Sequence, residues 1–247
     1  MRDIPAAPAR PSAGPATVRS RRHGPTAPGA PGRTATRWAV ALLTAAAVVY
    51  NDWLLALFLP TGLDPRHSYV SELYAADQPF HVLFGAVEVL AAALVVAGAL
   101  LALRRPANRW ARAGWWSLVG FGVSSVADVV VPMRCAPSVE HPCEAVNPWH
   151  TTTSAFVHLA LFASMLLLTV GLDAAARPPG PVRRWGPWVL GSALATALAT
   201  VGALLGHPGW HGVPQRAHLT LVGVWFLLLA VGLRGGLPGA GTGTRRR

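Results

Sequence analysis

The chain has 247 residues, of which 52% are hydrophobic and only 13% are charged, and its mean hydropathy is +0.40. An ordinary soluble domain has about a quarter of its residues charged, so this composition excludes one and indicates an integral membrane protein. The net charge of +11 comes from arginine without any lysine, and the arginines lie between apolar runs. That distribution is typical of membrane topology, so we expect membrane lipids as partners and no nucleic acid.

Residues 1–36 are rich in Pro, Ala, Gly and Arg and contain almost no large apolar side chains. Such a segment cannot bury enough surface to offset the entropy of ordering, so we expect a disordered cytoplasmic tail. Arg21 and Arg22 are not followed by a short apolar stretch with a cleavage site, which argues against an export signal. Residues 37–234 form the predicted membrane domain, and residues 235–247 form a short second cytoplasmic tail.

Six apolar runs meet or approach the length of about 20 residues that crosses the hydrocarbon core of a bilayer. They occupy residues 38–59, 79–103, 113–133, 149–172, 186–206 and 217–234. Eighteen arginines lie at the two termini and in alternate connections, whereas the other connections carry only Arg66, Arg134 and Arg216. The positive-inside rule therefore predicts cytoplasmic termini. The predicted fold is all-α, a six-transmembrane-helix bundle in the plasma membrane.

Acidic residues and histidines are distributed in the opposite way to the arginines. Eight of the nine histidines fall in outer connections or in the outer halves of the spans. The ionisable residues predicted to lie inside the outer half of the bilayer are Asp52, Glu88, Asp128 and His158. Such residues are expensive in lipid and usually mark a site or a partner. We therefore expect function at the outer face.

The stretch 124–158 concentrates this unusual chemistry. His150, Ser154 and His158 follow one another at intervals of four, so on a helix they form one polar stripe. The stripe either makes hydrogen bonds between helices or contributes to the mixed nitrogen and oxygen ligands typical of catalytic zinc. Both interpretations stay open, and with them the question of whether the protein is an enzyme. The candidate zinc ligands are Asp128, His150, His158 and His218.

Asp128 has a simpler interpretation, in which it forms an ion pair or hydrogen bond with a histidine of the fourth run and holds that hairpin closed. Ser124 lies one turn earlier on the same face, and Pro132 ends or kinks the run. Beyond it, Cys135 and Cys143 share one outer connection, where an oxidising compartment would let them form a disulfide.

Asp52 and Glu88 have no arginine at their depth. Each is therefore expected to be protonated, in contact with water in a cavity, or paired with a histidine, which leaves a proton relay open. Near the last span, Trp210 is an expected interfacial anchor, as is Trp149 before the fourth span. Arg216 either binds a lipid phosphate or extends along the helix end to the surface, and the second interpretation is favoured.

Several of these residues together resemble a family of bacterial and archaeal membrane proteins known only as domain of unknown function 998. They are Ser71-Glu72-Leu73 with Pro79 and Phe84, Asp128 with Pro132, His150 with Ser154, and Gly212 with Gln215-Arg216 before Trp225. The resemblance covers residues 38–234 and implies a six-helix membrane domain without an assigned reaction. A more distant likeness is to membrane zinc hydrolases of the alkaline ceramidase and adiponectin-receptor type. This chain departs from them, with six runs instead of seven.

We predict an integral membrane protein of unassigned activity with a pocket in the outer half of the bilayer that binds a lipid or a small hydrophobic ligand. The pocket candidates are Ser71, Glu72, Glu88, Ser124, Ser154, Gln215 and Arg216. Two alternatives stay open. The first is a zinc-dependent hydrolase of a lipid or amide, and the second is a proton-coupled carrier of a small molecule.

Overall fold

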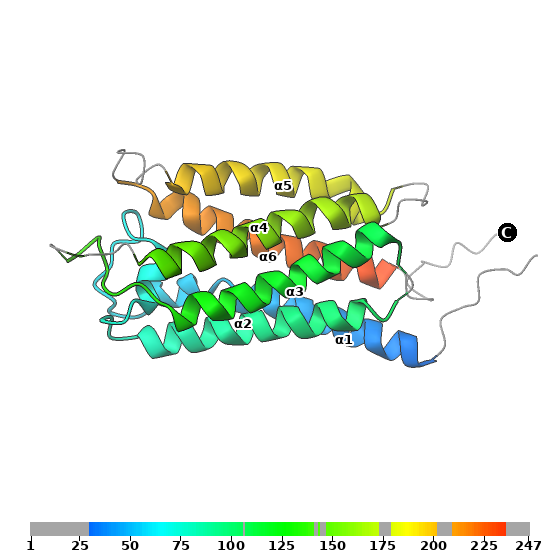
Figure 1. The fold of residues 1–247 in the computed structure, drawn as a ribbon, viewed down its shortest axis with the longest axis horizontal. Helices are drawn as coiled ribbons and strands as arrows, with labels where there is room; N and C mark the ends of the chain where they lie inside the picture. Colours follow the sequence, from blue (N-terminus) through cyan, green and yellow to red (C-terminus); the bar gives the residue numbers. More distant parts are fainter. Residues whose placement is uncertain are drawn as a thin grey trace, which may run out of the picture.

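In the computed structural model, six long helices lie side by side in one bundle (Figure 1). The structure describes residues 30–105, 107–140, 143, 147–172, 179–201 and 209–235. The long helices are α1 (Ala30–Val49), α2 (His81–Ala102), α3 (Arg109–Val130), α4 (Pro148–Gly171), α5 (Pro181–Thr200) and α6 (Gly212–Gly235). Two short 3-10 helices, η1 (Asp52–Leu57) and η2 (Val70–Tyr74), connect α1 to α2. These residues contain no strand, so the all-α prediction is confirmed.

Five segments of the described chain are long and apolar enough to cross a membrane. They are Gly32–Leu57, which joins α1 to η1, and the helices α2, α3, α4 and α6. Helix α5 has 20 residues, but Arg183, Arg184 and several Gly, Ser and Thr residues make it less apolar. A multi-pass helical membrane protein is therefore confirmed, whereas the sixth crossing, by α5, stays a prediction.

The first helix begins earlier than predicted, because α1 starts at Ala30 and includes the last residues of the segment assigned to the tail. Pro31 falls in the first turn, where a helix loses nothing from the missing N–H of proline. Thr36 donates a hydrogen bond from its hydroxyl to the carbonyl of Gly32, at 2.9 Å, inside this helix. The helix therefore includes residues 30–36 of the segment assigned to the tail, and residues 1–29 lie outside the described part of the chain.

The first helix also ends earlier than its apolar run, at Val49 rather than near residue 59. The side chain of Asn51 donates to the carbonyl of Ala47 at 2.9 Å, and asparagine favours such local bonds over helix continuation. The chain then turns into η1, which carries Asp52 in its first turn. At the other end of the domain, α6 includes Gly235, which had been assigned to the second tail.

Sequential helices are neighbours in the bundle, and α1 also packs against α6. The core between them contains large buried side chains, among them Tyr50, Phe121 and Phe226, whose ring centroids lie 5.7 to 5.8 Å apart. Elsewhere small residues let helix backbones approach closely, as helices in membranes commonly do. A Cβ atom at Gly122 of α3 would lie 3.0 Å from the carbonyl oxygen of Ala92 in α2.

Both termini of the bundle lie at one end, because α1 begins and α6 ends there (Figure 1). At the opposite end α1, α3 and α5 finish, and α2, α4 and α6 begin. We call this opposite end the outer end, following the topology predicted from the arginines. Asp52, Glu88 and Asp128 all lie toward it.

The predicted topology has a direct test. A reporter enzyme that is active only outside the cytoplasm should be active when fused after Gly62 or Ser138, and silent when fused after Gly180. The reason is that arginine-rich connections are retained in the cytoplasm. Reporter activity in colonies compares the three fusions at matched expression, and activity after Gly180 would show that the chain crosses the membrane differently.

Candidate functional site

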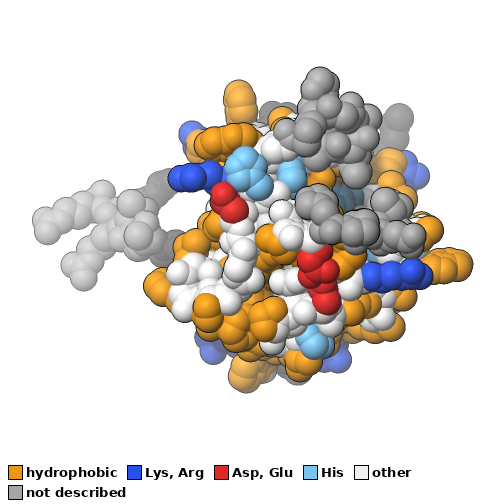
Figure 2. All heavy atoms as spheres, turned by 90° about the vertical axis from the view of Figure 1, so that its left-hand side faces the viewer, with side chains coloured by type: hydrophobic (Ala, Val, Ile, Leu, Met, Phe, Trp, Pro, Cys, Tyr) orange, Lys and Arg blue, Asp and Glu red, His pale blue; other side chains and the backbone are white. Residues whose placement is uncertain are grey.

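The outer end differs in character from the sides of the bundle. Figure 2 shows this end face on, with acidic and histidine side chains toward the middle and hydrophobic side chains around the rim. Trp149 at the start of α4 and Trp210 before α6 are both exposed, where an interfacial anchor would be. The polar residues that the sequence singled out are therefore found below and within this end, in three groups.

The first group surrounds Asp128, which is only 8% exposed near the outer end of α3. Its Oδ1 accepts hydrogen bonds from the hydroxyls of Thr153 and Ser154 in α4, at 2.6 and 2.8 Å. Its Oδ2 accepts one from the hydroxyl of Tyr74 in η2, at 3.2 Å. Nδ1 of His150, in the first turn of α4, lies 3.3 Å from Oδ1. We call these five residues the Asp128 cluster.

The Asp128 cluster is built to hold a negative charge among apolar helices. Three hydroxyl donors and an imidazole surround one carboxyl group, and such donors stabilise a carboxylate that water cannot reach. Burial raises the pKa of Tyr74, and the charge of Asp128 raises it further, so the phenol keeps the proton that it donates. The structure thus places Asp128 beside a histidine of the fourth run, which links α3, α4 and η2.

Two further acids lie near this cluster. Asp52 at the start of η1 is buried, and Glu88 in α2 is half-buried. Glu88 is close enough to Asp52 and Asp128 for their charges to interact, and Ser125 of α3 faces it. No arginine within the described part of the chain forms an ion pair with any of the three. We call Asp52, Glu88 and Asp128 the intramembrane acids.

The second group is a pair of histidines deeper in the bundle. The rings of His158 in α4 and His218 in α6 are stacked, with centroids 5.3 Å apart. Nδ1 of His158 lies 2.7 Å from the carbonyl of Ser154, and Nδ1 of His218 lies 2.9 Å from the carbonyl of Ala193. Backbone carbonyls accept hydrogen bonds, so both Nδ1 atoms carry the proton. Each imidazole is thereby held in a fixed orientation.

The four predicted zinc ligands therefore form two pairs, Asp128 with His150 and His158 with His218, instead of one centre. Among the residues that the structure describes, no three His, Cys, Asp or Glu side chains come together in a way that could hold a metal ion. Structural zinc needs four such ligands and catalytic zinc usually needs three. The arrangement of these residues thus gives zinc chemistry no support.

The third group is the outer cap, formed by residues 61–80, by the connection after α3 and by the start of α6. Glu72 is fully buried within it. One oxygen of its carboxyl group accepts the backbone N–H of Tyr69 at 2.7 Å, and the other accepts the N–H and hydroxyl of Ser138, at 3.1 and 2.5 Å. With three donors in place, Glu72 fastens the connection after α3 to η2.

Cys135 and Cys143 form a disulfide, as predicted, and Ser138 lies inside the loop that this disulfide closes. The disulfide therefore holds the segment that covers Glu72.

Reduction of the disulfide is expected to lower the free energy of unfolding by about 2–3 kcal/mol, because the unfolded chain gains the freedom of a short loop. The measurement is unfolding of the purified protein by a denaturing detergent, with and without a reductant. The control is the double variant Cys135→Ser with Cys143→Ser, which should be less stable and indifferent to the reductant. Equal stability of the oxidised and reduced protein would refute this role.

Gln215 and Arg216 connect the first turn of α6 to the same cap. The side-chain carbonyl of Gln215 accepts the N–H of Val70 at 2.5 Å. Nη1 of Arg216 donates to the carbonyls of Pro65 and Ser68, at 2.6 and 2.9 Å. Arg216 is only 7% exposed, so its guanidinium does not extend to the surface as the favoured interpretation held. It clamps the connection between η1 and η2 onto α6.

The remaining pocket candidates, Ser71 and Ser124, lie in different elements. The hydroxyl of Ser71 donates to the sulfur of Met133 at 3.4 Å, inside the outer cap. Ser124 is half-buried on α3, and its neighbour Ser125, which the sequence reasoning did not select, is the residue that faces Glu88. Both serines precede Asp128 by about one turn, so spacing alone cannot choose between them.

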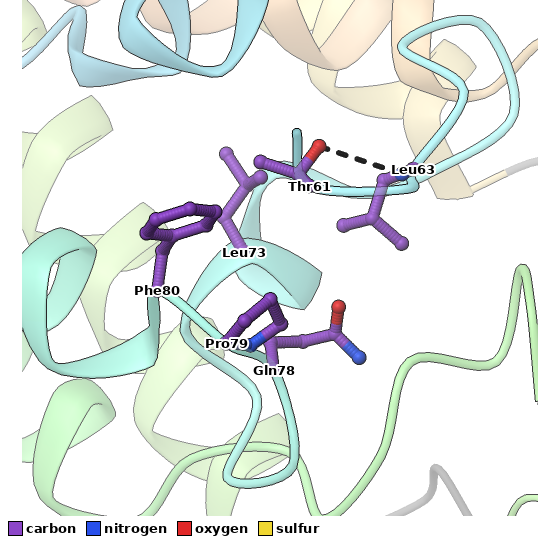
Figure 3. Close-up of a pocket in the computed structure, with 6 residues that line it drawn as sticks. All are labelled: Thr61, Leu63, Leu73, Gln78, Pro79 and Phe80. Carbon is purple, nitrogen blue, oxygen red and sulfur yellow. Dashed lines mark hydrogen bonds between the residues drawn. The ribbon is translucent and has the colours of Figure 1, made fainter. Parts of the chain in front are cut away.

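A small hollow opens in the outer cap beside these residues (Figure 3). It is lined by Thr61, Leu63, Leu73, Gln78, Pro79 and Phe80, and it leaves no room for a molecule as large as water. Ligand pockets usually have volumes of roughly 300 Å³ or more. None of its lining residues was a pocket candidate, so this hollow is not the predicted site.

Three residues of these groups carried no signal in the sequence analysis. Thr153 could have been found, since it lies three residues after His150 and thus on the same face of α4. Tyr74 and Tyr69 could not, because they belong to an irregular connection whose path no periodic pattern reveals.

One comparison with known proteins finds a relation. The family described as "Protein of unknown function (DUF998)" matches residues 39–232, a range that covers most of the chain, from within α1 to within α6. No curated protein and no solved structure matches the chain.

Proposed function

The chain belongs to the DUF998 family of proteins of unknown function, and we propose that it binds a ligand or lipid in the outer half of the bilayer, through the intramembrane acids. One observation carries this proposal. Asp52 and Asp128 both lie within electrostatic range of Glu88 among apolar helices, and no arginine in the described ranges pairs with the three acids, although Asp128 has His150 beside it. Acids in such a place need a proton or a counter-charge. A ligand with a positively charged head group supplies the counter-charge.

Glu88 is the acid best placed to meet such a ligand. The oxygens of Asp128 already accept three hydroxyl hydrogen bonds, and Asp52 is buried at the start of η1. Glu88, by contrast, is half-buried on α2, with Ser125 of α3 beside it. An ammonium group donates three hydrogen bonds and carries a compact charge, so it suits this carboxyl group.

The experiment compares two lipids with identical acyl chains. Thermal unfolding of the purified protein in a maltoside detergent is followed while dioleoyl phosphatidylethanolamine or dioleoyl phosphatidylcholine is added. The ethanolamine head group donates hydrogen bonds and the choline head group has no N–H to donate. We expect the ethanolamine lipid to stabilise the protein more, because a ligand that binds only the folded state raises stability.

The variants make this experiment specific. Glu88→Gln should weaken the apparent affinity for the ethanolamine lipid by about tenfold or more, since a charge-assisted hydrogen bond is lost. Glu140→Gln is the matched control, because Glu140 is exposed in the connection after α3. Equal stabilisation by both lipids, or an unchanged response of Glu88→Gln, would contradict the proposal.

Two alternative functions were predicted from the sequence. The zinc-dependent hydrolase stays a prediction, and no group of three metal ligands among the described residues supports it. The proton-coupled carrier also stays a prediction. Location in the plasma membrane, with both termini in the cytoplasm, is likewise proposed from the arginine distribution.

A further inference from the structure

We propose a second site in the outer cap, beside the start of α6, that binds an oxyanion such as a phosphate or carboxylate group. It is formed by Tyr69, His211 and Arg216. Four buried polar atoms of these side chains have no hydrogen-bond partner among the residues that the structure describes: the hydroxyl of Tyr69, both ring nitrogens of His211 and Nε of Arg216. Buried polar groups are nearly always paired, so four unpaired atoms on three side chains of the outer cap indicate a missing partner.

The three side chains belong to two backbone segments that lie together. The rings of Tyr69 and His211 lie against each other, with centroids 4.2 Å apart. The guanidinium of Arg216 donates to the carbonyl of Ser68, the residue before Tyr69, and to that of Gly212, the residue after His211. Arg216 is therefore held between the two backbone segments that carry the other two residues.

Three of the four unpaired atoms can donate a hydrogen bond. Burial raises the pKa of Tyr69, and the charge of Glu72 raises it further, so the phenol keeps its O–H. Burial lowers the pKa of His211; nearby Glu72 opposes this shift, whereas His67 and Arg216 add to it, so the ring is neutral with one N–H. Together with Nε–H of Arg216, three donors are available to one acceptor.

The charges nearby also favour an oxyanion. Arg216 is fully charged at any physiological pH, and the carbonyls that hold it are neutral. The charge of Glu72 acts on both His211 and Arg216, and its oxygens accept hydrogen bonds from Tyr69 N–H and from Ser138. Asp64 is exposed, where solvent screens its charge. A phosphate or carboxylate oxygen would thus find a positive charge and three donors.

The same chemistry could come from a lipid head group or from a free anion, and the experiment separates the two. Thermal unfolding of the full-length protein in a maltoside detergent is measured with inorganic phosphate against chloride at equal ionic strength. It is measured again with dioleoyl phosphatidic acid against dioleoylglycerol, which has the same chains without the phosphate. Stabilisation by inorganic phosphate assigns the site to a free anion, and stabilisation only by phosphatidic acid assigns it to a lipid.

Two conservative variants locate the effect. Tyr69→Phe removes only the hydroxyl, and His211→Phe keeps a ring against Tyr69 while it removes both nitrogens. Each should weaken the apparent affinity for the phosphate probe by about tenfold or more. His81→Phe is the matched control, because His81 is an exposed residue at the start of α2. Since the site shares no residue with the intramembrane acids, Glu88→Gln should keep the response to phosphate.

Three results would overturn the inference. The first is stabilisation by neither phosphate nor phosphatidic acid beyond their controls. The second is a response of Tyr69→Phe and His211→Phe equal to that of the parent protein. The third is loss of the phosphate response in His81→Phe to the same extent.

Discussion

Replacement of Asp128 by alanine is expected to lower the free energy of unfolding by about 3–5 kcal/mol, because it removes one partner from a buried, charge-assisted network. The hydroxyls of Tyr74 and Ser154 would lose their acceptor, whereas that of Thr153 also reaches the carbonyls of Trp149 and His150. The imidazole of His150 would lose the carboxyl group 3.3 Å from it. Since these contacts join three elements at the outer end, their loss should loosen α3 from both α4 and η2.

Asp128→Asn should be much milder than Asp128→Ala. Thr153 and Ser154 both donate to the same oxygen, which the asparagine amide can supply, and the hydroxyl of Tyr74 can turn to accept from the amide nitrogen. Asp77→Ala, at an exposed position of the outer cap, is the control and should change stability by less than about 0.5 kcal/mol. Unfolding by a denaturing detergent gives the three values. Similar losses for Asp128→Ala and Asp77→Ala would mean that the Asp128 cluster contributes little.

The second large effect is expected from Gly212→Ala, at the first residue of α6. A methyl group there would overlap the carbonyl oxygen of Pro65 and lie 2.6 Å from that of Ser68. These are the two carbonyls that accept hydrogen bonds from Arg216. The connection would have to move away from α6, which leaves a buried guanidinium without its acceptors. A loss of about 3 kcal/mol or more is expected, as for other groups that leave a buried charge unpaired.

Gly191→Ala is the matched control for this effect. Gly191 lies in the interior of α5, and a Cβ atom there meets nothing within 4 Å. Alanine is a better helix former than glycine by about 1 kcal/mol, so this variant should match or exceed the parent in stability. The same unfolding measurement compares both variants. If Gly212→Ala proved as stable as Gly191→Ala, the close contact between α6 and the outer cap would not be needed.

The helices could be predicted from the sequence because hydropathy over about 20 residues reports the environment of a whole segment. Their ends could not, because ends depend on single local bonds. The first helix illustrates this: the side-chain bond from Asn51 to Ala47 ends it within an apolar run that continues to residue 59. The ends of α1 and α6 accordingly differ from the ends of the predicted apolar runs.

The candidate site was predictable where it depended on neighbouring helices. Asp128 and His150 lie at facing ends of one hairpin, and short connections make sequential helices neighbours. The zinc hypothesis combined residues of α3, α4 and α6, and the sequence contains no information on how α6 is rotated. His218 turned out to stack on His158, away from Asp128 and His150.

The outer cap was the least predictable part. Arg216 is held by backbone carbonyls, which every residue has, so no residue type in residues 61–70 marks its partners. Tyr69 and His211 meet across 142 positions of sequence through irregular backbone, and neither spacing nor charge indicates such a contact. Residues of this kind become visible only when the fold is known.

The most direct test of the central claim, that the intramembrane acids bind a ligand, is native mass spectrometry of the protein released from cell membranes. The parent protein is expected to retain a bound molecule with an amine head group at low detergent. Glu88→Gln, expressed and purified in the same way, should retain about tenfold less of it, because the charge-assisted contact is missing. The account would be contradicted if both proteins carried the same lipids in the same proportions.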